Sequence, residues 1–225
     1  MISSKNDLKI FFRDKSLKNI FILCGKKSFN LSGAEKFFSE ILADKNVKFF
    51  FKENHVPVIE ELTKIIIEIK SFKPDMILAI GGGSVIDYAK IANIVDEIDN
   101  LSNLIITDTY SFKKKNYNLT VIPTTAGSGA EVTSNAVIYI DKKKYSVESN
   151  LLLPNNFFLI PEFLISAQDK IKASAGFDAI AQALESLISK KSDEKSVEYA
   201  TKSLKVSLNC FISFLNNSNL KNATE

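Results

Sequence analysis

Residues Met76–Lys90 read MILAIGGGSVIDYAK, and this stretch decides the fold. The apolar run at 76–80 predicts a buried strand, and apolar side chains recur at helical spacing from Ser84 onward. A strand that turns through glycines into a helix leaves free backbone N–H groups at a helix end whose dipole favours anions. We therefore expect a phosphate group at residues 81–84. The alternative is an ordinary turn in which glycine only supplies a positive φ.

The bulk composition is that of an ordinary globular protein. The chain has 225 residues, of which 45% are hydrophobic and 24% charged, enough for one large or two modest domains. No apolar run approaches the roughly 20 residues that span a membrane, and the N-terminus lacks a signal-peptide core. Two distant cysteines, Cys24 and Cys210, fit a reducing compartment. The net charge of +3 comes from scattered lysines. We expect a cytoplasmic protein without nucleic-acid or membrane partners.

Strands and helices alternate along the first 160 residues, which predicts an α/β fold with a parallel sheet. The expected strands are 18–24, 47–51, 76–80 and 118–122, with a short strand at 104–106 and a hairpin of 135–140 with 144–148. The expected helices are 32–42, 58–72 and the segment after Ser84, with a turn at 25–28 and a lysine-rich loop at 111–118. In the helix 58–72 the apolar face predicts that Glu60, Glu61, Lys64 and Glu68 lie on the solvent face.

A second run of small and hydroxyl side chains follows the strand at 118–122. It reads PTTAGSGAE from Pro123 to Glu131. Threonine and serine hydroxyls bond phosphate or ribose oxygens, although the same residues also cap helices. Because ligands of parallel sheets sit outside the carboxyl ends of the strands, two such loops at neighbouring strand ends indicate a nucleotide site.

The character of the chain changes near residue 160. From there helical patterns predict helices at 174–189 and 193–215, followed by a polar loop to the end. We expect a nucleotide-binding domain at 1–160 and a helical part at 161–225. Asp178, Gln182 and Glu185 fall on one face of the first of these helices, as a solvated polar face or as part of a site.

Three motifs in this order and spacing carry a family resemblance. GGGSVIDYAK, PTTAGSGAEVTSNAV and GFDAIAQALES resemble the iron-containing (group III) alcohol dehydrogenases, whose superfamily includes glycerol dehydrogenase and dehydroquinate synthase. The resemblance runs from about residue 18 to the C-terminus. It implies a Rossmann-like domain, then an all-helical metal-binding domain in a dehydroquinate synthase-like architecture. NAD(P) and a divalent metal, iron or zinc, are expected between the two domains.

The resemblance also implies roles for individual residues. Gly82, Gly83 and Ser84 are expected at the pyrophosphate, and Asp87 beside the cofactor. The hydroxyl residues Thr124, Thr125 and Ser128 are expected to line the cofactor site, with the threonines on its adenine and ribose side. Lys144 matches a family lysine near the nicotinamide ribose.

The metal site departs from the family pattern. Asp178 matches the first metal ligand, but Gln182 stands where the pattern D-A-x-x-H-A-x-E has histidine. A glutamine carbonyl binds hard cations and is a poor ligand for Fe²⁺ or Zn²⁺. His55 is the single histidine of the chain, and we read it as a loop residue. The remaining family ligands are histidines further along, so the chain resembles the N-terminal portion of a longer protein.

The turn after the first strand bears on the choice of cofactor. Many NAD-preferring relatives have an aspartate here that bonds the adenosine ribose, whereas this chain has Gly25-Lys26-Lys27-Ser28. Without the carboxylate a 2′-phosphate is not repelled, and lysines and a hydroxyl can bind it. This favours NADP(H), unless the lysines are only exposed turn residues.

These features predict a metal-dependent, NAD(P)-dependent alcohol dehydrogenase or aldehyde reductase acting on a small alcohol or aldehyde. The segments KKYSVESNLLLP and FDAIAQALES resemble the phosphonoacetaldehyde reductase branch. The alternative is a non-catalytic nucleotide-binding remnant with an incomplete metal site. A lyase like dehydroquinate synthase fits less well, because it calls for glutamate at Asp178. A homodimer is compatible with the sequence.

Overall fold

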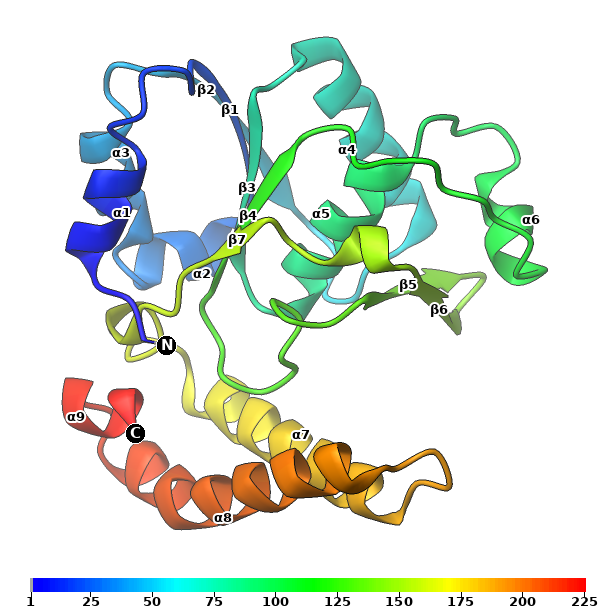
Figure 1. The fold of residues 1–225 in the computed structure, drawn as a ribbon. Coiled ribbons are helices and arrows are strands. Elements are labelled where there is room, and N and C mark those ends of the chain that lie inside the picture. The colour runs from blue at the N-terminus through cyan, green and yellow to red at the C-terminus, as the bar shows by residue number, and fades with distance from the viewer. Residues whose placement is uncertain (1) are drawn as a thin grey trace.

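A parallel sheet of five strands, in the order β2-β1-β3-β4-β7, forms the centre of the molecule (Figure 1). The computed structural model describes residues 2–225. The strands are β1 (Asn19–Gly25), β2 (Asn46–Lys52), β3 (Met76–Gly81), β4 (Asn118–Pro123) and β7 (Asn156–Phe157). The strands β1 to β4 confirm the expected α/β fold with a parallel sheet. No helix within residues 2–225 combines the length and the apolar character that crossing a membrane requires.

Helices cover both faces of this sheet, and the alternation of side chains along each strand decides which face is which. On β1, Ile20 and Ile22 belong to the core beneath α1 (Lys5–Phe11), α2 (Lys26–Leu31) and α3 (Ala34–Ile41). Phe21 and Leu23 belong to the opposite core, beneath α4 (Ile59–Phe72) and α5 (Gly83–Ile94). Burial on both faces explains the nearly continuous apolar runs of the central strands.

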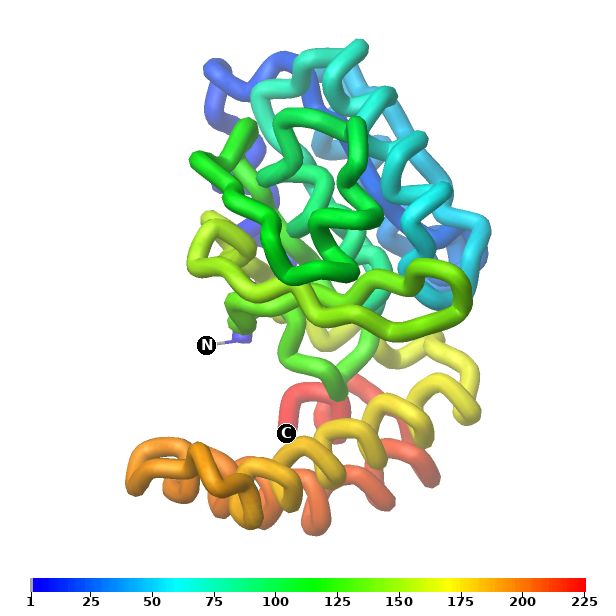
Figure 2. The backbone as a smooth tube through the Cα atoms, turned by 90° about the vertical axis from the view of Figure 1, so that its right-hand side faces the viewer, coloured from blue at the N-terminus to red at the C-terminus, as the bar shows by residue number. Residues whose placement is uncertain are grey.

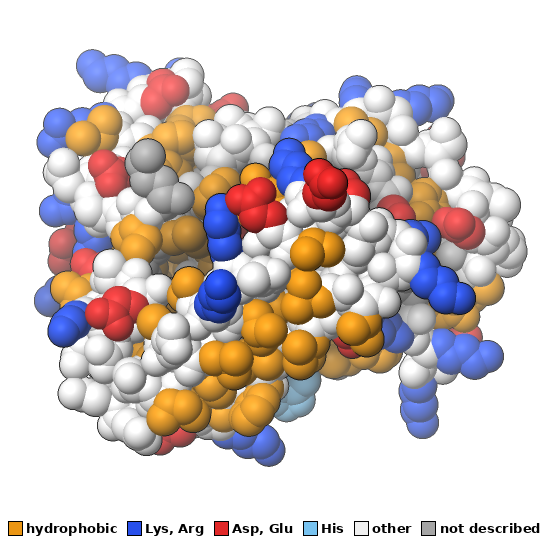
Figure 3. All heavy atoms as spheres, turned by 60° about the horizontal axis from the view of Figure 1, so that its bottom comes forward, with side chains coloured by type: hydrophobic (Ala, Val, Ile, Leu, Met, Phe, Trp, Pro, Cys, Tyr) orange, Lys and Arg blue, Asp and Glu red, His pale blue; other side chains and the backbone are white. Residues whose placement is uncertain are grey.

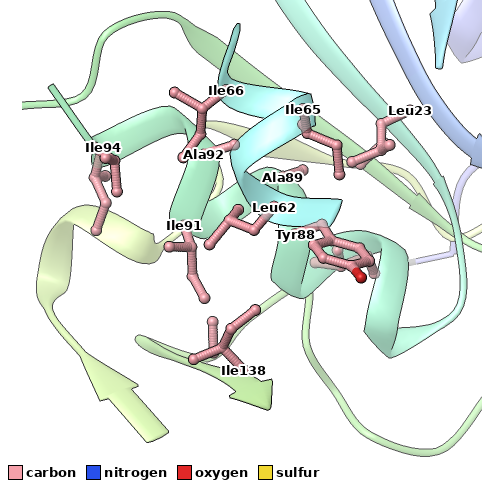
Figure 4. Packing of buried hydrophobic residues seen from close by; sticks show 14 of the residues in the cluster. Leu23, Leu62, Ile65, Ile66, Tyr88, Ala89, Ile91, Ala92, Ile94 and Ile138 are labelled. Atoms are coloured by element: carbon pink, nitrogen blue, oxygen red, sulfur yellow. The ribbon is translucent and has the colours of Figure 1, made fainter. Parts of the chain in front are cut away.

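The helices α4 and α5 pack against each other as well as against the sheet. Figure 4 shows Leu62 and Ile66 of α4 close to Ala89 and Ala92 of α5, with the Tyr88 ring beside them. Small alanine side chains let the two helix backbones approach closely. The helix that follows the glycine turn is therefore held firmly: its residues 85, 86 and 88–94 are all buried.

A hairpin extends the structure beyond the sheet. It consists of β5 (Asn135–Ile140) and β6 (Lys143–Glu148), so Lys143 belongs to a strand instead of the expected turn. The turn itself is Asp141-Lys142, and both residues have a positive φ, 48° and 64°. A two-residue turn of this kind matches the twist of the two strands.

Three further expectations about local structure were wrong. The residues 104–106 form the end of a helix, α6 (Leu101–Ile106), because Leu101 and Ile105 are buried one helical turn apart. The residues after Gly25 begin α2 directly, with Phe29 as the buried anchor and no side-chain cap to announce the helix. The polar end of the chain contains a short helix, α9 (Leu220–Thr224), which is capped by the side chain of Asn219.

After the short 3-10 helix Pro161–Phe163, the structure contains only α-helices, α7 (Asp169–Ile188), α8 (Glu194–Asn216) and α9. The pair α7–α8 lies apart from the sheet, beyond the carboxyl ends of its strands, and the views in Figures 1 and 2 agree on this. Hydrophobic side chains gather on the face shown in Figure 3. In the α7–α8 pair, Phe177, Ile188 and Ile212 are more than half exposed. The division of the chain into two domains at residue 160 remains a prediction.

Candidate cofactor-binding site

A cavity of about 600 Å³ lies at the carboxyl ends of β1 to β4. Its walls come from residues 25–28, 31 and 32 after β1, 52–55 at the end of β2, Gly82 and Ser84 after β3, Thr124 and Thr125 after β4, and Phe163, 166–168 and 171. Every strand of the central four thus contributes to one cleft, as expected for a parallel sheet. Of the residues expected to bind the cofactor, Gly82, Ser84, Thr124 and Thr125 line this cleft.

The turn between β3 and α5 offers free donors to the cleft. Gly82 is the N-cap of α5, and its carbonyl accepts hydrogen bonds from the N–H groups of Val85 and Ile86. The N–H groups of Gly83 and Ser84 donate to no acceptor within residues 2–225. Because α5 has 12 residues, its N-terminus also carries the positive end of a full helix dipole. The arrangement suits a phosphate group.

The segment after β4 covers the two glycines closely. A Cβ on Gly82 would lie 3.1 Å from Thr125 Oγ1, and a Cβ on Gly83 would lie 2.9 Å from Ser128 Oγ. The N–H of Thr124 donates to the carbonyl of Gly81 at 3.0 Å, which fixes the start of the segment. The two glycines therefore lie in close contact with hydroxyl side chains, and the two sequence motifs meet as expected.

Asp87 and Lys144 lie outside the residues that line the cleft. Burial raises the pKa of Asp87 to about 6, opposed by the charge of Lys90, by the backbone N–H of Val137 and by the charge of Lys144. Lys144 itself is exposed on β6. The side chains of Asp87 and Lys144 are therefore close enough for their charges to interact. They lie next to the contact between α5 and β5.

The carboxylate of Glu61 fixes the loop after β2, and the sequence pattern placed this residue wrongly on the solvent face of α4. Its side chain is only 4% exposed. It accepts hydrogen bonds from the N–H groups of Glu53 (2.6 Å) and Asn54 (3.2 Å), from Asn54 Nδ2 (2.9 Å) and from the Tyr88 hydroxyl (2.7 Å). Burial raises the pKa of Glu61, but these hydrogen bonds outweigh it, so its pKa lies below the ordinary value.

The sequence does not predict the hydrogen bonds of Glu61, because nothing in the helical periodicity distinguishes Glu61 from its neighbour Glu60. The available signal was the tyrosine on the buried face of α5, since a buried hydroxyl needs a partner. His55 follows the same loop, is exposed and lines the cleft, which confirms its reading as a loop residue.

Basic side chains surround the end of the cleft beside β1 and β2. Lys26 and Lys27 are exposed in the first turn of α2 and line the cavity. Lys52 is half-buried, and its Nζ donates to the carbonyl of Asn54 at 2.6 Å. Burial lowers the pKa of Lys52, opposed by the nearby charge of Glu61. This corner therefore favours an anionic group on the ligand.

The two residues expected to hold a metal lie together on one helix. Asp178 and Gln182 lie on an exposed face of α7, and Gln182 Nε2 donates to Asp178 Oδ2 at 2.7 Å. Glu185 is exposed on the same helix. Within residues 2–225, no three histidine, cysteine, aspartate or glutamate side chains cluster as metal ligands would. One carboxylate and one amide, already bonded to each other, do not match the three or four donors that iron or zinc needs.

A second cavity of about 240 Å³ adjoins the cleft on the side of α7 and α8. The two cavities share Thr124, Thr125, Ala167 and Ile171. The segment after β4 separates them and packs tightly on α7, since a Cβ on Gly127 would lie 2.5 Å from the carbonyl oxygen of Ala175. On this side the cleft is therefore bordered by a smaller, mainly apolar space.

The chain is similar in sequence to several known dehydrogenases. The sequence profile of the family "Iron-containing alcohol dehydrogenase" matches residues 4–161. A 1-propanol dehydrogenase of Citrobacter freundii is 29% identical over 191 residues, which cover 84% of this chain and 48% of that protein. A 4-hydroxybutyrate dehydrogenase of Clostridium kluyveri is 30% identical over 168 residues, which cover 72% of this chain and 44% of that protein.

Solved structures agree with this match. An iron-containing alcohol dehydrogenase from Thermococcus thioreducens superposes with a TM-score of 0.86 at 20% identity, over 99% of this chain and 61% of the other. A sulfoacetaldehyde reductase from Bifidobacterium kashiwanohense, solved in complex with NAD⁺, gives a TM-score of 0.85 at 24% identity and the same coverage. The chain spans about half the length of the curated relatives it matches. The family profile covers well over half of the chain, which therefore belongs to the iron-containing alcohol dehydrogenase family.

Proposed function

We propose that the cleft binds a nicotinamide dinucleotide, with its pyrophosphate on the β3–α5 turn. The observation that carries this proposal is the pair of free N–H groups of Gly83 and Ser84 at the N-terminus of α5. Gly82 and Gly83 present no Cβ, so that the phosphate oxygens can approach the backbone. The hydroxyl of Ser84, which also lines the cleft, is available to the same oxygens.

The second hydroxyl segment holds the other side of the cofactor in this proposal. Thr124 is 4% exposed and Thr125 lies against Gly82, so both side chains border the pyrophosphate and the adjoining ribose. Ser128 lies against Gly83 and extends the same wall. Lys144 is assigned to the nicotinamide ribose and Asp87 to a place beside the cofactor, as the family resemblance implies. Their charges lie on the hairpin side of α5.

We assign the corner beside β1 to the adenosine ribose, with NADP(H) preferred over NAD(H). Gly25 puts no carboxylate there, and Lys26 and Lys27 border the cavity. Lysine ammonium groups attract a 2′-phosphate, whereas an aspartate at this position repels it. The relative solved with NAD⁺ is a different protein at 24% identity, and it supports nicotinamide binding in general.

The reaction proposed for the intact active site is hydride transfer between the nicotinamide ring and a small alcohol or aldehyde. Membership of the family supports this class of reaction. The nicotinamide supplies the hydride, and the chain binds the pyrophosphate, aligns the ring and keeps water out of the cleft. Since Asp178 and Gln182 are fewer than the three or four donors that iron or zinc needs, we assign no step of the reaction to them.

Phosphonoacetaldehyde is the candidate substrate that the sequence segments favour, and a sulfoacetaldehyde reductase shares the fold. An assay of NADPH oxidation with phosphonoacetaldehyde and with short aliphatic aldehydes, in the presence of Fe²⁺ or Zn²⁺, tests this choice. Equal or better turnover of the aliphatic aldehydes contradicts it. The cytoplasmic location and the homodimer stay predictions.

The second candidate is a nucleotide-binding protein without catalysis. Gln182 in place of the family histidine favours it, because a glutamine carbonyl is a poor ligand for Fe²⁺ or Zn²⁺. Both candidates require cofactor binding, so titration of the protein with NADPH and NADH is the first experiment. A dissociation constant in the micromolar range for NADPH supports the proposed site. If neither cofactor binds, both proposals fail.

A further inference from the structure

Lys90 is completely buried, and its ammonium group donates hydrogen bonds to the segment that follows β4. The Nζ donates to the carbonyl of Thr133 at 2.8 Å, to Thr133 Oγ1 at 2.9 Å and to the carbonyl of Asn135 at 3.0 Å. Its relative exposure is 0%. All three donors of the ammonium group are therefore used. Two of them bind Thr133, at the far end of residues 124–134, which we call the hydroxyl segment, and the third binds Asn135, the first residue of β5.

Burying a lysine side chain costs free energy, because its charge is removed from water. Burial lowers the pKa of Lys90 to about 8, opposed by the charges of Asp87 and Glu131. A leucine or methionine would fill the same volume without desolvating a charge, and such replacements are often neutral or stabilising. The residue is better explained by what its hydrogen bonds hold in place.

The hydroxyl segment is tied to the β3–α5 unit at both ends. At its start the N–H of Thr124 donates to the carbonyl of Gly81 at 3.0 Å, and at its end Lys90 binds Thr133 and Asn135. Within the described chain, residues 125–132 form hydrogen bonds only with one another: Ala130 with Ser128, and Val132 with Gly129. The segment has no helix or strand of its own. Its hydrogen bonds to the rest of the chain therefore lie at its two ends, where the N–H of Ser149 also donates to the carbonyl of Ser134. Its middle is held by packing alone, with Ala130 buried and Gly127 against Ala175.

The position of this segment decides the shape of the cleft. Thr125 lies over Gly82, and Ser128 lies over Gly83. These are the contacts that set the distance between the hydroxyl side chains and the free N–H groups of α5. In well-studied enzymes, a shift of about 1 Å in such positioning groups lowers the reaction rate about a hundredfold.

We propose that Lys90 is a positioning residue for the cofactor: it locks the end of the hydroxyl segment so that Thr125 and Ser128 stay over the β3–α5 turn. This inference rests on the proposed nicotinamide dinucleotide site. Lys90 does not line the cleft and acts through the segment it holds.

The test compares variants of both partners. In Lys90→Met the three hydrogen bonds are lost, and we expect NADPH to bind at least tenfold more weakly, as judged by its fluorescence. Thr133→Val removes one hydrogen bond and nearly conserves the volume, with an expected loss of roughly fivefold. Thr133→Ser keeps the hydroxyl and restores wild-type binding. Lys64→Met, at an exposed lysine of α4, is the matched control and leaves binding unchanged.

Hydrogen–deuterium exchange provides a readout that does not need the cofactor. We expect faster exchange of residues 124–134 in Lys90→Met and Thr133→Val, with unchanged exchange in β1 and β3. If Lys90→Met does not fold, the Thr133 pair carries the test. Folded Lys90→Met or Thr133→Val protein with wild-type affinity and wild-type exchange overturns the inference. If the wild type binds no cofactor, the proposed function fails, and the exchange data still decide whether Lys90 locks the segment.

Discussion

The hydroxyl of Tyr88 donates a hydrogen bond to Oε2 of Glu61 at 2.7 Å. This bond connects α5, which begins at the glycine turn, to α4 and to the loop after β2. The same hydroxyl accepts the N–H of Val58 at 2.7 Å, while Glu61 holds the N–H groups of Glu53 and Asn54. Two walls of the cleft are thus fixed to each other by one buried polar network, whose members are costly to leave without partners.

We expect Glu61→Gln to lower the free energy of unfolding by about 2 kcal/mol at pH 7, because an acceptor oxygen becomes a donor facing other donors. Tyr88→Phe should lower it by about 1–2 kcal/mol for the loss of the hydroxyl bonds. Urea unfolding measures both. Since the pKa of Glu61 is lowered in the folded protein, its contribution is present above the unfolded value near 4.5 and is lost as the pH falls through the folded value. The difference in the free energy of unfolding between wild type and Glu61→Gln should therefore shrink as the pH is lowered. A difference that stays constant with pH contradicts this.

Cofactor preference is tested by Gly25→Asp. Gly25 has φ −89° and ψ 123°, which any residue adopts, and it is the N-cap of α2, where aspartate is favourable. We expect NADPH to bind at least tenfold more weakly, because the carboxylate repels the 2′-phosphate, and NADH to bind at least as well as before. Gly25→Asn is the uncharged control and should keep most NADPH affinity. An equal loss for the two cofactors would show that this corner does not hold the 2′-phosphate.

The raised pKa of Asp87 predicts a pH dependence of stability. Burial is the main cause of its value of about 6, against the charges of Lys90 and Lys144 and the N–H of Val137. The folded protein then holds the proton more tightly than the unfolded chain, so stability falls as the pH rises from about 4 to about 6. Lys90 stays protonated in this range, since its pKa is about 8.

The measurement for Asp87 is urea unfolding of wild type and Asp87→Asn between pH 4 and pH 8. As the pH rises from 4 to 6, we expect the free energy of unfolding of the wild type to fall relative to that of the variant. Above pH 6 the difference between the two should be constant. A difference that does not change with pH would mean that Asp87 titrates in the same way in both states.

Metal binding should be weak and should improve when the family histidine is restored. In Gln182→His, the imidazole replaces the amide that now donates to Asp178, four residues earlier on the same helix face. We expect the Zn²⁺ affinity to rise at least tenfold, measured by calorimetric titration. The double variant Asp178→Asn/Gln182→His should lose most of this gain. Tight stoichiometric binding of Zn²⁺ or Fe²⁺ by the wild type contradicts our reading of the pair.

The sequence sufficed for the central strands and long helices because their patterns are strong and local. Buried runs such as 76–80 and the apolar face of α4 leave little choice of secondary structure. The glycine turn and the hydroxyl segment were also recognisable, since each follows directly on a strand. The short helices α2 and α6 were missed because each has only six residues, and no side-chain cap marks its start.

What the sequence could not reveal is which polar residues become buried partners. Glu61 looks like a solvent-facing residue in the helical pattern, and Lys90 was not singled out at all. Their roles depend on Tyr88 and on Thr133, 27 and 43 residues away. Such long-range pairs have no periodic signal, so only the fold brings them together.

The variant Gly83→Ala tests the proposal that the β3–α5 turn holds the pyrophosphate of a nicotinamide dinucleotide. Alanine is a good helix former, and the Ser128 hydroxyl that its Cβ meets at 2.9 Å can rotate away, so the protein should stay folded. Ser128→Ala is the control, with a loss of roughly fivefold at most.

Fluorescence titration of wild type, Gly83→Ala, Ser128→Ala and the double variant with NADPH and NADH is the deciding measurement. We expect Gly83→Ala to bind both cofactors at least tenfold more weakly than wild type, and the double variant to stay as weak, because the added Cβ lies between the N-terminus of α5 and the hydroxyl segment, beside the N–H groups proposed for the phosphate. Wild-type affinity in folded Gly83→Ala protein would contradict a pyrophosphate at this turn.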